Sequence, residues 1–372
     1  MMQFPAKHVY AVIMAGGTGG LMLWPYSRKK NPKQFIDVFG SGTMVESAIA
    51  RLKDFILSEN IYVVTHVQGE MMMRRFLPWF PSENVLVEPV ARDTAPCIAL
   101  ATAYISKRDP DAMMIAVPAD LLVLDELSFV EILKAGVSVA QDKKSIVTIG
   151  VTPDRPEPEY GYIQVDKPRA ADDILPGSTI SLFSVRAFAE KPDIKTAQEF
   201  IDSGDFYWNS GILLWHIDVI RREFERSMPD LYKDLQCIYD SIGSGRERAV
   251  IEDVYSWIHP VSIAYGIMEH AESVYMLAGS FGWTDLGSWD DVLKIEKKDH
   301  PEAGVADANL VQVDTANNFV KKPRDKAVVI VGLADIIVID TKDALLICRK
   351  GHSQDVRKVV DVLRREGLED YL

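Results

Sequence analysis

The feature that most constrains the fold of this 372-residue chain is an alternation of two kinds of segment over its first 150 residues. Short apolar runs rich in Val and Ile are typical of buried strands, and they cover 9–14, 61–65, 85–89, 113–120 and 145–151. Between them lie segments with apolar residues at helical spacing, at 44–55, 94–107 and 127–141. Strands and helices in alternation predict an α/β fold with a parallel sheet covered on both faces.

The pattern changes along the rest of the chain. Residues 178–193 predict a pair of strands that closes on a Lys-Pro turn, and residues 206–224 predict a loop and a strand that lead into a helix. From residue 306, short β-branched runs broken by Gly, Asn and Asp predict an all-β element. An amphipathic helix closes it, with Val356, Val359, Val360 and Leu363 on one face. We therefore expect two domains, 1–305 and 306–372.

Charge and cysteine content restrict the class of protein. The formal net charge of -13 argues against binding to nucleic acids or anionic membranes, because phosphate backbones are repelled at long range. No stretch approaches twenty apolar residues, so no membrane span is expected. The chain has an odd number of cysteines, Cys97, Cys237 and Cys348, and their spacing fits neither a metal site nor a redox motif. Such a set is a poor framework for disulfides. We expect a soluble protein of the cytoplasm.

A glycine-rich loop follows the first predicted strand, with Gly16, Gly17 and Gly19 in the sequence GGTGG. Such a loop presents backbone N–H groups to an anion, although a merely tight turn is the alternative. The spacing fits neither GxGxxG nor GxxxxGK(S/T), which discounts a nicotinamide-dependent oxidoreductase and a Walker A site. A cluster of cations follows the loop, at Arg28, Lys29, Lys30 and Lys33. Lys33, between Pro32 and Gln34, is the candidate for phosphate, whereas Lys29 and Lys30 are explained equally well as solvated surface residues.

Two isolated carboxylates are candidate metal ligands. Asp120 ends a predicted strand in VPAD, and Asp285 lies in FGWTDLGSW between aromatic and glycine residues. Mg2+ typically takes one or two carboxylates together with phosphate oxygens and water. Each carboxylate alone could equally be a helix cap or a turn former, and the histidines show no HExxH spacing.

Two further motifs suit a polyhydroxylated ligand that carries a phosphate. EKPD places Glu190 and Lys191, and WNSG places Asn209, at the edges of predicted strands. Acid and amide groups bind hydroxyls, and an ammonium binds the phosphate charge. Surface turns are the alternative for both motifs. In EPVARDTAP, Arg92 and Asp93 precede a helix, where Asp93 or Thr94 could simply be an N-cap.

In their order and spacing these motifs resemble the sugar-phosphate nucleotidyltransferases, and within them the mannose-1-phosphate guanylyltransferases. The resemblance covers essentially the whole chain. The motifs that carry it are MAGGTGG…LWPYSRKKNPKQF, EPVARDTAP, VPAD, EYGYI, FAEKPD, WNSGI, SIAYGIME and GWTDLGSW. It implies a GT-A/Rossmann-like catalytic domain with a mixed, mainly parallel sheet, followed by a small left-handed β-helix segment. The implied reaction joins GTP and mannose 1-phosphate into GDP-mannose and pyrophosphate, with Mg2+.

The resemblance also implies roles for individual residues. Lys33, Arg28 and Asp120 would be catalytic, and Asp120 and Asp285 would hold the metal. Gly16, Gly17, Gly19, Glu88, Arg92 and Thr94 would bind the nucleotide. Gly161, Glu190, Lys191 and Asn209 would bind the sugar phosphate. A homodimer is expected, because exposed strands in the C-terminal segment are natural dimer contacts.

The chain departs from the family pattern in its first loop. Family members have GxGTRLWP, with an Arg that contacts the leaving pyrophosphate, whereas this loop is GTGGLMLWP and lacks that Arg. Leu121, Ala264 and His270 replace a family His, Asp and Lys. Arg28 or Lys30 would have to substitute for the missing Arg. Two other functions therefore stay open: a weakly active or inactive regulator that binds sugar nucleotides, and a nucleotidyltransferase for another hexose 1-phosphate.

Overall fold

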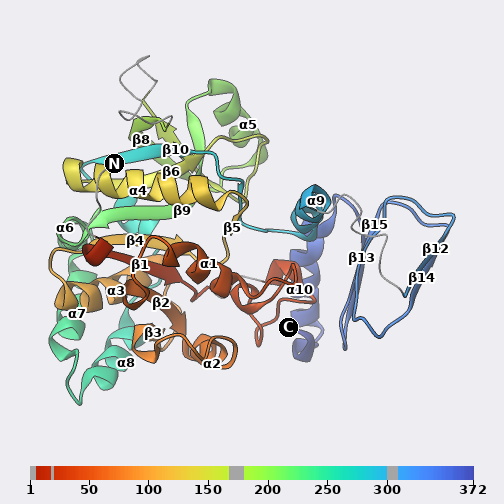
Figure 1. Cartoon of the computed structure of the whole chain (residues 1–372), viewed down its shortest axis with the longest axis horizontal. Coiled ribbons are helices and arrows are strands. Elements are labelled where there is room, and N and C mark those ends of the chain that lie inside the picture. The colour runs from red at the N-terminus through yellow and green to blue at the C-terminus, as the bar shows by residue number, and fades with distance from the viewer. Residues whose placement is uncertain (1–5, 18–20, 167–179, 300–308) are drawn as a thin grey trace. The chain divides into compact units, whose positions relative to one another are not determined.

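The computed structural model describes residues 6–17, 21–166, 180–299 and 309–372. The chain divides into two compact units, each formed from segments that are far apart in sequence (Figure 1). Unit 1 comprises Met1–Gly16, Ala48–Ala119 and Val123–Trp283, and unit 2 comprises Gly17–Ser47, Asp120–Leu122 and Thr284–Leu372. The expected domain boundary at 305 falls within 300–308, outside the described residues, and stays a prediction.

Unit 1 is built on a nine-stranded sheet with the order β3-β2-β1-β4-β9-β6-β10-β8-β7. Its strands are β1 (Val9–Met14), β2 (Ile61–His66), β3 (Val85–Glu88), β4 (Met113–Pro118), β6 (Ile146–Val151), β7 (Gly161–Val165), β8 (Leu182–Glu190), β9 (Phe206–His216) and β10 (Val274–Gly279). β3, β2, β1 and β4 are mutually parallel, as are β6 and β10. β9 runs antiparallel to β4 and β6, and β8 runs antiparallel to β10 and β7. The predicted α/β fold with a mixed, mainly parallel sheet is confirmed.

The five strands predicted over the first 150 residues are all present, with bounds that differ by at most two residues. Two local predictions were wrong. Residues 182–190 form one continuous strand, β8, in place of a strand pair, because the segment pairs with β7 on one side and β10 on the other. The loop expected from residue 206 is the start of β9, which pairs with β7 through Phe206, Tyr207 and Trp208.

Helices cover both faces of this sheet. Those that lie against its strands are α2 (Val67–Phe76), α3 (Thr94–Arg108), α4 (Glu126–Lys143), α5 (Ile194–Ser203) and α6 (Ile217–Ser227). α7 (Pro229–Ser241) packs against α3 and α6, and α8 (Glu247–Trp257) packs against α7. α1 (Met44–Lys53) precedes β2 in the chain. On β9, Leu213 and Trp215 share a buried cluster with α3 and α6, whereas Leu214 lies against Gly136 of α4. Because successive side chains of a strand point to opposite faces, α4 lies on the face opposite to α3 and α6.

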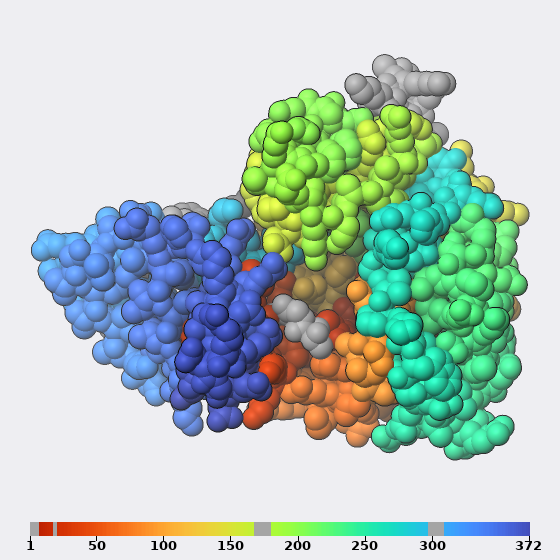
Figure 2. Space-filling view, turned by 180° about the vertical axis from the view of Figure 1, so that it is seen from behind, coloured from red at the N-terminus to blue at the C-terminus, as the bar shows by residue number. Residues whose placement is uncertain are grey.

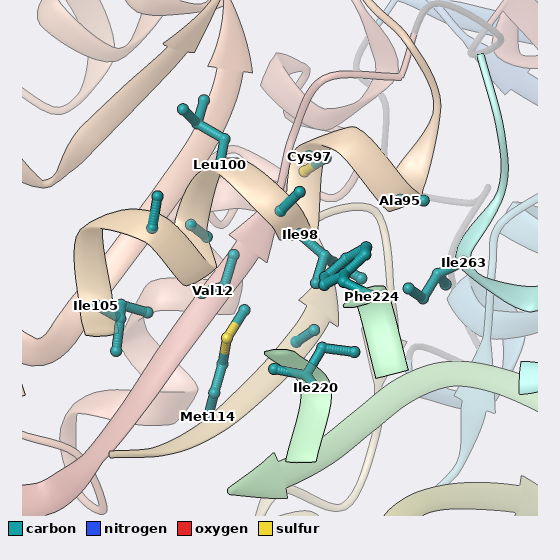
Figure 3. Packing of buried hydrophobic residues seen from close by; sticks show 14 of the residues in the cluster. Val12, Ala95, Cys97, Ile98, Leu100, Ile105, Met114, Ile220, Phe224 and Ile263 are labelled. Atoms are coloured by element: carbon teal, nitrogen blue, oxygen red, sulfur yellow. The ribbon is translucent and has the colours of Figure 1, made fainter. Parts of the chain in front are cut away.

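The main core of unit 1 lies between α3 and the sheet (Figure 3). Val12 of β1 and Met114 of β4 face Ile98 of α3, and Phe224 of α6 packs against the same cluster. α3 is rich in Ala, which lets the helix approach the sheet closely, and most of its residues are buried. This core holds the carboxyl ends of β1, β3 and β4 in place, where the motifs identified in the sequence begin.

Unit 2 combines α9 (Trp289–Asp299), β12 (Leu310–Val313), β13 (Phe319–Lys321), β14 (Val328–Val331), β15 (Ile336–Asp340), β16 (Leu345–Arg349) and α10 (Val356–Arg365) with short helical turns, among them η3 (Lys33–Phe35). β12 pairs with β14, and β13 pairs with β15, both in parallel. The predicted amphipathic helix is confirmed as α10, with Val356 and Val360 buried. Two-residue strands β5 (Leu122–Val123) and β11 (Trp283–Thr284) form a separate sheet.

The segment that follows the glycine loop folds with the C-terminal residues. Leu23 and Trp24 share a buried cluster with Trp289 and with residues of β13, β15 and α10. The indole of Trp289 donates to the main-chain oxygen of Trp24 at 2.9 Å, and the indole of Trp24 donates to that of Tyr371 at 2.8 Å. The aromatic residues of LWPY are therefore structural anchors for the basic segment. Across the described ranges, none of the helices combines the length and the apolar character that crossing a membrane requires.

Candidate functional site

Three residues predicted to act on phosphate and metal meet in unit 2. Asp120 follows β4 by two residues, Asp285 follows β11, and Lys33 begins η3 directly after Pro32. The Lys33 ammonium lies 3.0 Å from Asp120 Oδ2 and also donates to the main-chain oxygen of Asp285. The side chain of Lys33 is only 7% exposed, whereas that of Asp120 is 42% exposed. A nearly buried cation is thus held beside a carboxylate that solvent and ligands can reach.

The chemistry of this group fits a divalent cation. Asp120 and Asp285 supply hard oxygen atoms, which Mg2+ prefers. Gly287 leaves room beside Asp285, since a Cβ at Gly287 would lie 3.2 Å from Asp285 Oδ1. The described part of the chain contains no cluster of three or more His, Cys, Asp or Glu side chains arranged for a metal. The assignment of these two carboxylates to a metal stays a prediction, in which phosphate oxygens and water would complete the coordination.

Arg28 is engaged elsewhere in unit 2. Its guanidinium donates to the main-chain oxygens of Pro25 and Tyr371, both at 2.7 Å, and to Asp343 Oδ1 at 3.0 Å. The same group lies 5.7 Å from the ring centroid of Trp24. A role for Arg28 at the substrate phosphates would require these bonds to break. In this structure, Arg28 links the basic segment to the C-terminal residues.

The glycine loop begins in unit 1 against a buried acid. A Cβ at Gly16 would lie 2.7 Å from Glu88 Oε2, so a larger residue would displace the carboxyl group. Gly17 has open space around its Cα, and in unit 2 its main-chain oxygen accepts a hydrogen bond from Gln34 at 3.2 Å. Gly19 lies outside the described residues. Gly16 and Glu88, both predicted nucleotide ligands, are therefore in direct contact.

Glu88 is a buried acid whose pKa is raised. It ends β3 with 2% exposure, and this burial raises its pKa to about 8, with the hydroxyl of Tyr255 opposing the shift. The Tyr255 hydroxyl lies 3.2 Å from Glu88 Oε1 and 3.1 Å from the carbonyl of Pro96. A phenol has one proton, and the Pro96 carbonyl can only accept. The hydroxyl proton of Tyr255 is therefore shared between the Pro96 carbonyl and Glu88, and its bond to Glu88 opposes the rise in pKa that burial causes.

We expect Glu88→Gln to remove a pH dependence of stability. The pKa of Glu88 is raised from 4.5 to about 8, so its contribution is fully present below pH 4.5 and is lost as pH rises through 8. Between pH 5 and 9 the free energy of unfolding of the native protein should fall relative to Glu88→Gln by on the order of 3–5 kcal/mol. Denaturant titrations at successive pH values measure this difference.

Glu252→Gln is the matched control for this change, because Glu252 lies on α8 with a side chain that is 53% exposed. Its unfolding curve should stay parallel to that of the native protein across the same pH range. Parallel curves for Glu88→Gln as well would show that Glu88 titrates alike in the folded and unfolded chain.

Arg92 and Thr94 join the EPVARDTAP segment to neighbouring parts of unit 1. The Arg92 guanidinium donates through Nε and Nη2 to the main-chain oxygen of Tyr255, at 3.2 and 3.1 Å, near the end of α8. The hydroxyl of Thr94 accepts from the Ile263 N–H at 2.8 Å, within the SIAYGIME motif. Asp93 is the N-cap of α3 and accepts from the Thr94 N–H at 2.7 Å, as the structural alternative predicted.

The residues predicted to bind sugar hydroxyls lie together at one end of β7, β8 and β9. Gly161 pairs with Glu190 in adjacent strands. A Cβ at Gly161 would lie 2.9 Å from Glu190 Oε2 and 3.7 Å from Asn209 Nδ2, so glycine opens the space between them. Lys191 Nζ is 3.9 Å from Glu190 Oε1. Partial burial raises the pKa of Glu190, and the Lys191 ammonium opposes that shift.

Sequence reasoning missed the aromatic residues that hold these motifs together. Tyr160 packs edge-on against Trp208 and Trp283, with ring centroids 5.2 and 5.0 Å apart. The three residues come from EYGYI, from the residue before NSGI and from the start of WTDLGSW, so each motif carried one aromatic residue that could have been singled out. Tyr255 was missed as well, and it has no motif that would have indicated it.

The face of unit 1 seen in Figure 2 is hollowed beside these motifs. The hollow lies between yellow-green atoms of residues around 190–210, cyan atoms of residues around 255–270 and orange atoms of residues around 70–95. These segments include FAEKPD, WNSGI, SIAYGIME and EPVARDTAP. The motifs of unit 1 that were predicted to bind nucleotide and sugar therefore border one depression.

Comparison with known families covers nearly the whole chain. A family model for nucleotidyl transferases matches residues 10–302. A second model, for a MannoseP isomerase/GMP-like β-helix domain, matches residues 308–363. The β-helix predicted for the C-terminal segment agrees with this match.

Individual relatives and solved structures point the same way. The chain is 33% identical to mannose-1-phosphate guanylyltransferase ManC of Salmonella typhimurium over 98% of this chain and 75% of the relative. It is 32% identical to the mannose-1-phosphate guanylyltransferase of Escherichia coli, with the same coverage of both chains. A crystal structure from Thermus thermophilus, titled a mannose-1-phosphate geranyltransferase, superposes with a TM-score of 0.80 at 28% identity and covers 96% of this chain and 99% of that one.

Proposed function

This chain belongs to the nucleotidyl transferase family, among the mannose-1-phosphate guanylyltransferases, and on that premise we propose that it transfers GMP from GTP to α-D-mannose 1-phosphate. The products are GDP-mannose and pyrophosphate. The observation that carries the proposal is the buried Lys33 ammonium, which contacts Asp120 and Asp285 in a chain that matches these enzymes over 98% of its residues. We further propose that Mg2+ is the metal and that the protein acts in the cytoplasm.

The reaction is an in-line displacement at phosphorus. A phosphate oxygen of mannose 1-phosphate forms a bond to the α-phosphorus of GTP, and the bond from that phosphorus to the bridging oxygen breaks, so that pyrophosphate leaves. No covalent nucleophile on the protein is needed, and catalysis consists of positioning and charge neutralisation. Lys33 supplies a fixed positive charge for the α-phosphate. Asp120 and Asp285 would hold Mg2+, which neutralises phosphate charge when bound.

Unit 1 supplies the proposed recognition of nucleotide and sugar. Gly16 allows the main chain to approach a phosphate, and Gly17 and Gly19 continue the same loop. Glu88, Arg92 and Thr94 complete the proposed nucleotide residues. Glu190 and Asn209 offer an acceptor and an amide to mannose hydroxyls beside the Gly161 main chain, and Lys191 offers an ammonium to the sugar phosphate.

The departures from the family pattern keep two other functions open. Leu121 is buried with 2% exposure. Because its side chain has no polar atom, it cannot replace the polar group of a family His. Arg28, the proposed substitute for the missing loop Arg, is bound to Tyr371 and Asp343. A weak enzyme, or a regulator that binds sugar nucleotide without turnover, fits these departures. A nucleotidyltransferase for another hexose 1-phosphate also fits them.

Pyrophosphate release from GTP, with and without mannose 1-phosphate and Mg2+, tests the proposal. Turnover that requires all three supports it. No turnover, together with a thermal shift on addition of GDP-mannose, favours the regulator. The same assay with glucose and fucose 1-phosphates and each nucleoside triphosphate identifies a different substrate pair if one is preferred.

We also propose a homodimer formed through the C-terminal strands of unit 2. Val329 and Val331 of β14 are 61% and 60% exposed, and Val311 of β12 and Ile347 of β16 are 51% and 59% exposed. Apolar patches beyond a few hundred Å² are rare on monomers and mark interaction surfaces. Val329→Lys combined with Val331→Lys should convert the dimer to a monomer in light scattering. The control Lys358→Gln, at an exposed position of α10, should leave the dimer unchanged.

A further inference from the structure

A second pocket in unit 1 lies away from every residue assigned above. It has a volume of about 690 Å3, and its lining residues lie on or next to α4, α6 and α7. Its lining includes Lys144, Arg221 and Arg222, with His216, Asp218 and Glu225 beside them. This volume is in the range of pockets that bind small molecules.

The three cations of this pocket have no acidic partner in the part of the chain that the structure describes. Within the described ranges, no carboxylate lies within ion-pair distance of Lys144, Arg221 or Arg222. Arg222 Nε donates to the main-chain oxygen of Asp218, at 3.2 Å, and Arg221 lies 5.9 Å from the ring centroid of Tyr239. The chain carries 54 acidic and 41 basic residues, so unpaired cations gathered in one pocket are unexpected from composition. By contrast, Arg226 on the same helix pairs with Glu223 at 2.6 Å.

The pocket is remote from the proposed sugar residues. Asn209 lies near the start of β9, and His216 is its last residue. Seven residues of extended strand separate them by roughly 23 Å, at about 3.3 Å per residue. His216 pairs with Met113, the first residue of β4, so the pocket lies at the amino end of the parallel strands. A ligand bound there cannot reach the residues proposed to hold mannose 1-phosphate.

We propose that this pocket binds a phosphorylated, polyhydroxylated small molecule. Its phosphate would bind Arg221, Arg222 and Lys144, since guanidinium groups match phosphate oxygens in geometry and charge. Its hydroxyl groups would donate to the carboxylates of Asp218 and Glu225. These carboxylates would repel an anion that has no hydroxyl groups to donate. A nucleic acid is a poor occupant, because the net charge of -13 repels an extended phosphate backbone. The chemistry is thus that of a sugar phosphate or a nucleoside monophosphate at a second site.

The imidazole of His216 gives a local measurement of binding. The full chain, with 13C-labelled histidine, is titrated with inorganic phosphate, mannose 6-phosphate or GMP at constant ionic strength held with chloride, and the His216→Gln variant assigns the signal. We expect a saturable shift of this signal with mannose 6-phosphate or GMP. Arg221→Gln combined with Arg222→Gln should weaken binding tenfold or more, because two charge-assisted contacts are lost.

Arg248→Gln is the matched control, because Arg248 lies on α8 with a side chain that is 91% exposed and pairs with Glu252. It should bind the same ligands as the native protein. A shift that chloride alone reproduces, or that the double Arg variant retains, would overturn the proposal. Equal affinity for inorganic phosphate and for both esters would overturn the assignment of hydroxyl groups to Asp218 and Glu225. Binding in this assay is independent of turnover, so the proposed catalytic function can fail without affecting it.

Discussion

Lys33→Met should lower kcat/KM for pyrophosphate release by a factor on the order of 10²–10³, the range seen when one preorganised charge-stabilising contact is removed. The Lys33 side chain is almost fully buried and its ammonium contacts Asp120 and Asp285. Met keeps the apolar part of the side chain and removes the positive charge, so the variant loses the stabilisation of the negative charge on the α-phosphate in the transition state. The measurement is the initial rate with GTP, mannose 1-phosphate and Mg2+, with both substrates varied.

The control for this variant is Lys29→Met, four residues earlier in the same basic segment. Lys29 is half exposed and lies 3.4 Å from Glu369, a surface pair that contributes little to stability. Its activity should stay within about twofold of the native enzyme. Thermal unfolding of Lys33→Met then separates loss of catalysis from loss of the fold. A folded Lys33→Met enzyme with near-native kcat would remove Lys33 from the chemistry.

Asp285→Asn should reduce Mg2+-dependent turnover at least a hundredfold while the protein remains folded. An amide of the same shape retains hydrogen bonding but loses the negative charge that a hard divalent cation requires. The main-chain oxygen of Asp285 still accepts from Lys33 in this variant, so the position of the ammonium should be kept. The measurement is the Mg2+ concentration that gives half-maximal rate, together with the rate at saturation.

Asp361→Asn provides the comparison, because Asp361 is a 62% exposed carboxylate of α10 that pairs with Arg364. Its Mg2+ dependence should match that of the native enzyme. If Asp285→Asn shows the same Mg2+ dependence and rate as Asp361→Asn, Asp285 does not hold the metal. Mn2+ in place of Mg2+ tests whether a softer cation tolerates the amide ligand better.

The strand positions of the first half of the chain were accessible from sequence. Periodicity is a local property, and runs such as 9–14 and 113–118 lie in a sheet buried on both faces, where nearly every residue must be apolar. The errors fell where tertiary pairing overrides local pattern. β8 was expected to break into two strands, yet its neighbours β7 and β10 keep it continuous.

Some site residues could be named from sequence, but their partners could not. The GGTGG loop and Glu88 were both assigned to nucleotide, and only the structure shows that a Cβ at Gly16 would meet the Glu88 carboxyl. The contact joins residues separated by 72 positions, from Gly16 to Glu88, and no local pattern encodes such a distance. Tyr255, whose hydroxyl lies 3.2 Å from Glu88 Oε1, lies in an ordinary amphipathic helix, and no sequence motif indicated it.

The sequence by itself determined the class of fold, the family and the residue types available for phosphate and sugar chemistry, because these follow from local periodicity and from motifs of adjacent residues. Only the tertiary structure decided which of those residues act together. Through Trp24 and Trp289, the basic segment that follows the glycine loop packs with the C-terminal residues. The Lys33 ammonium lies beside the Asp120 carboxylate. Arg28 became bound to Tyr371 by the same packing. Contacts of this kind depend on how apolar side chains far apart in the chain are buried together, which no stretch of sequence specifies alone.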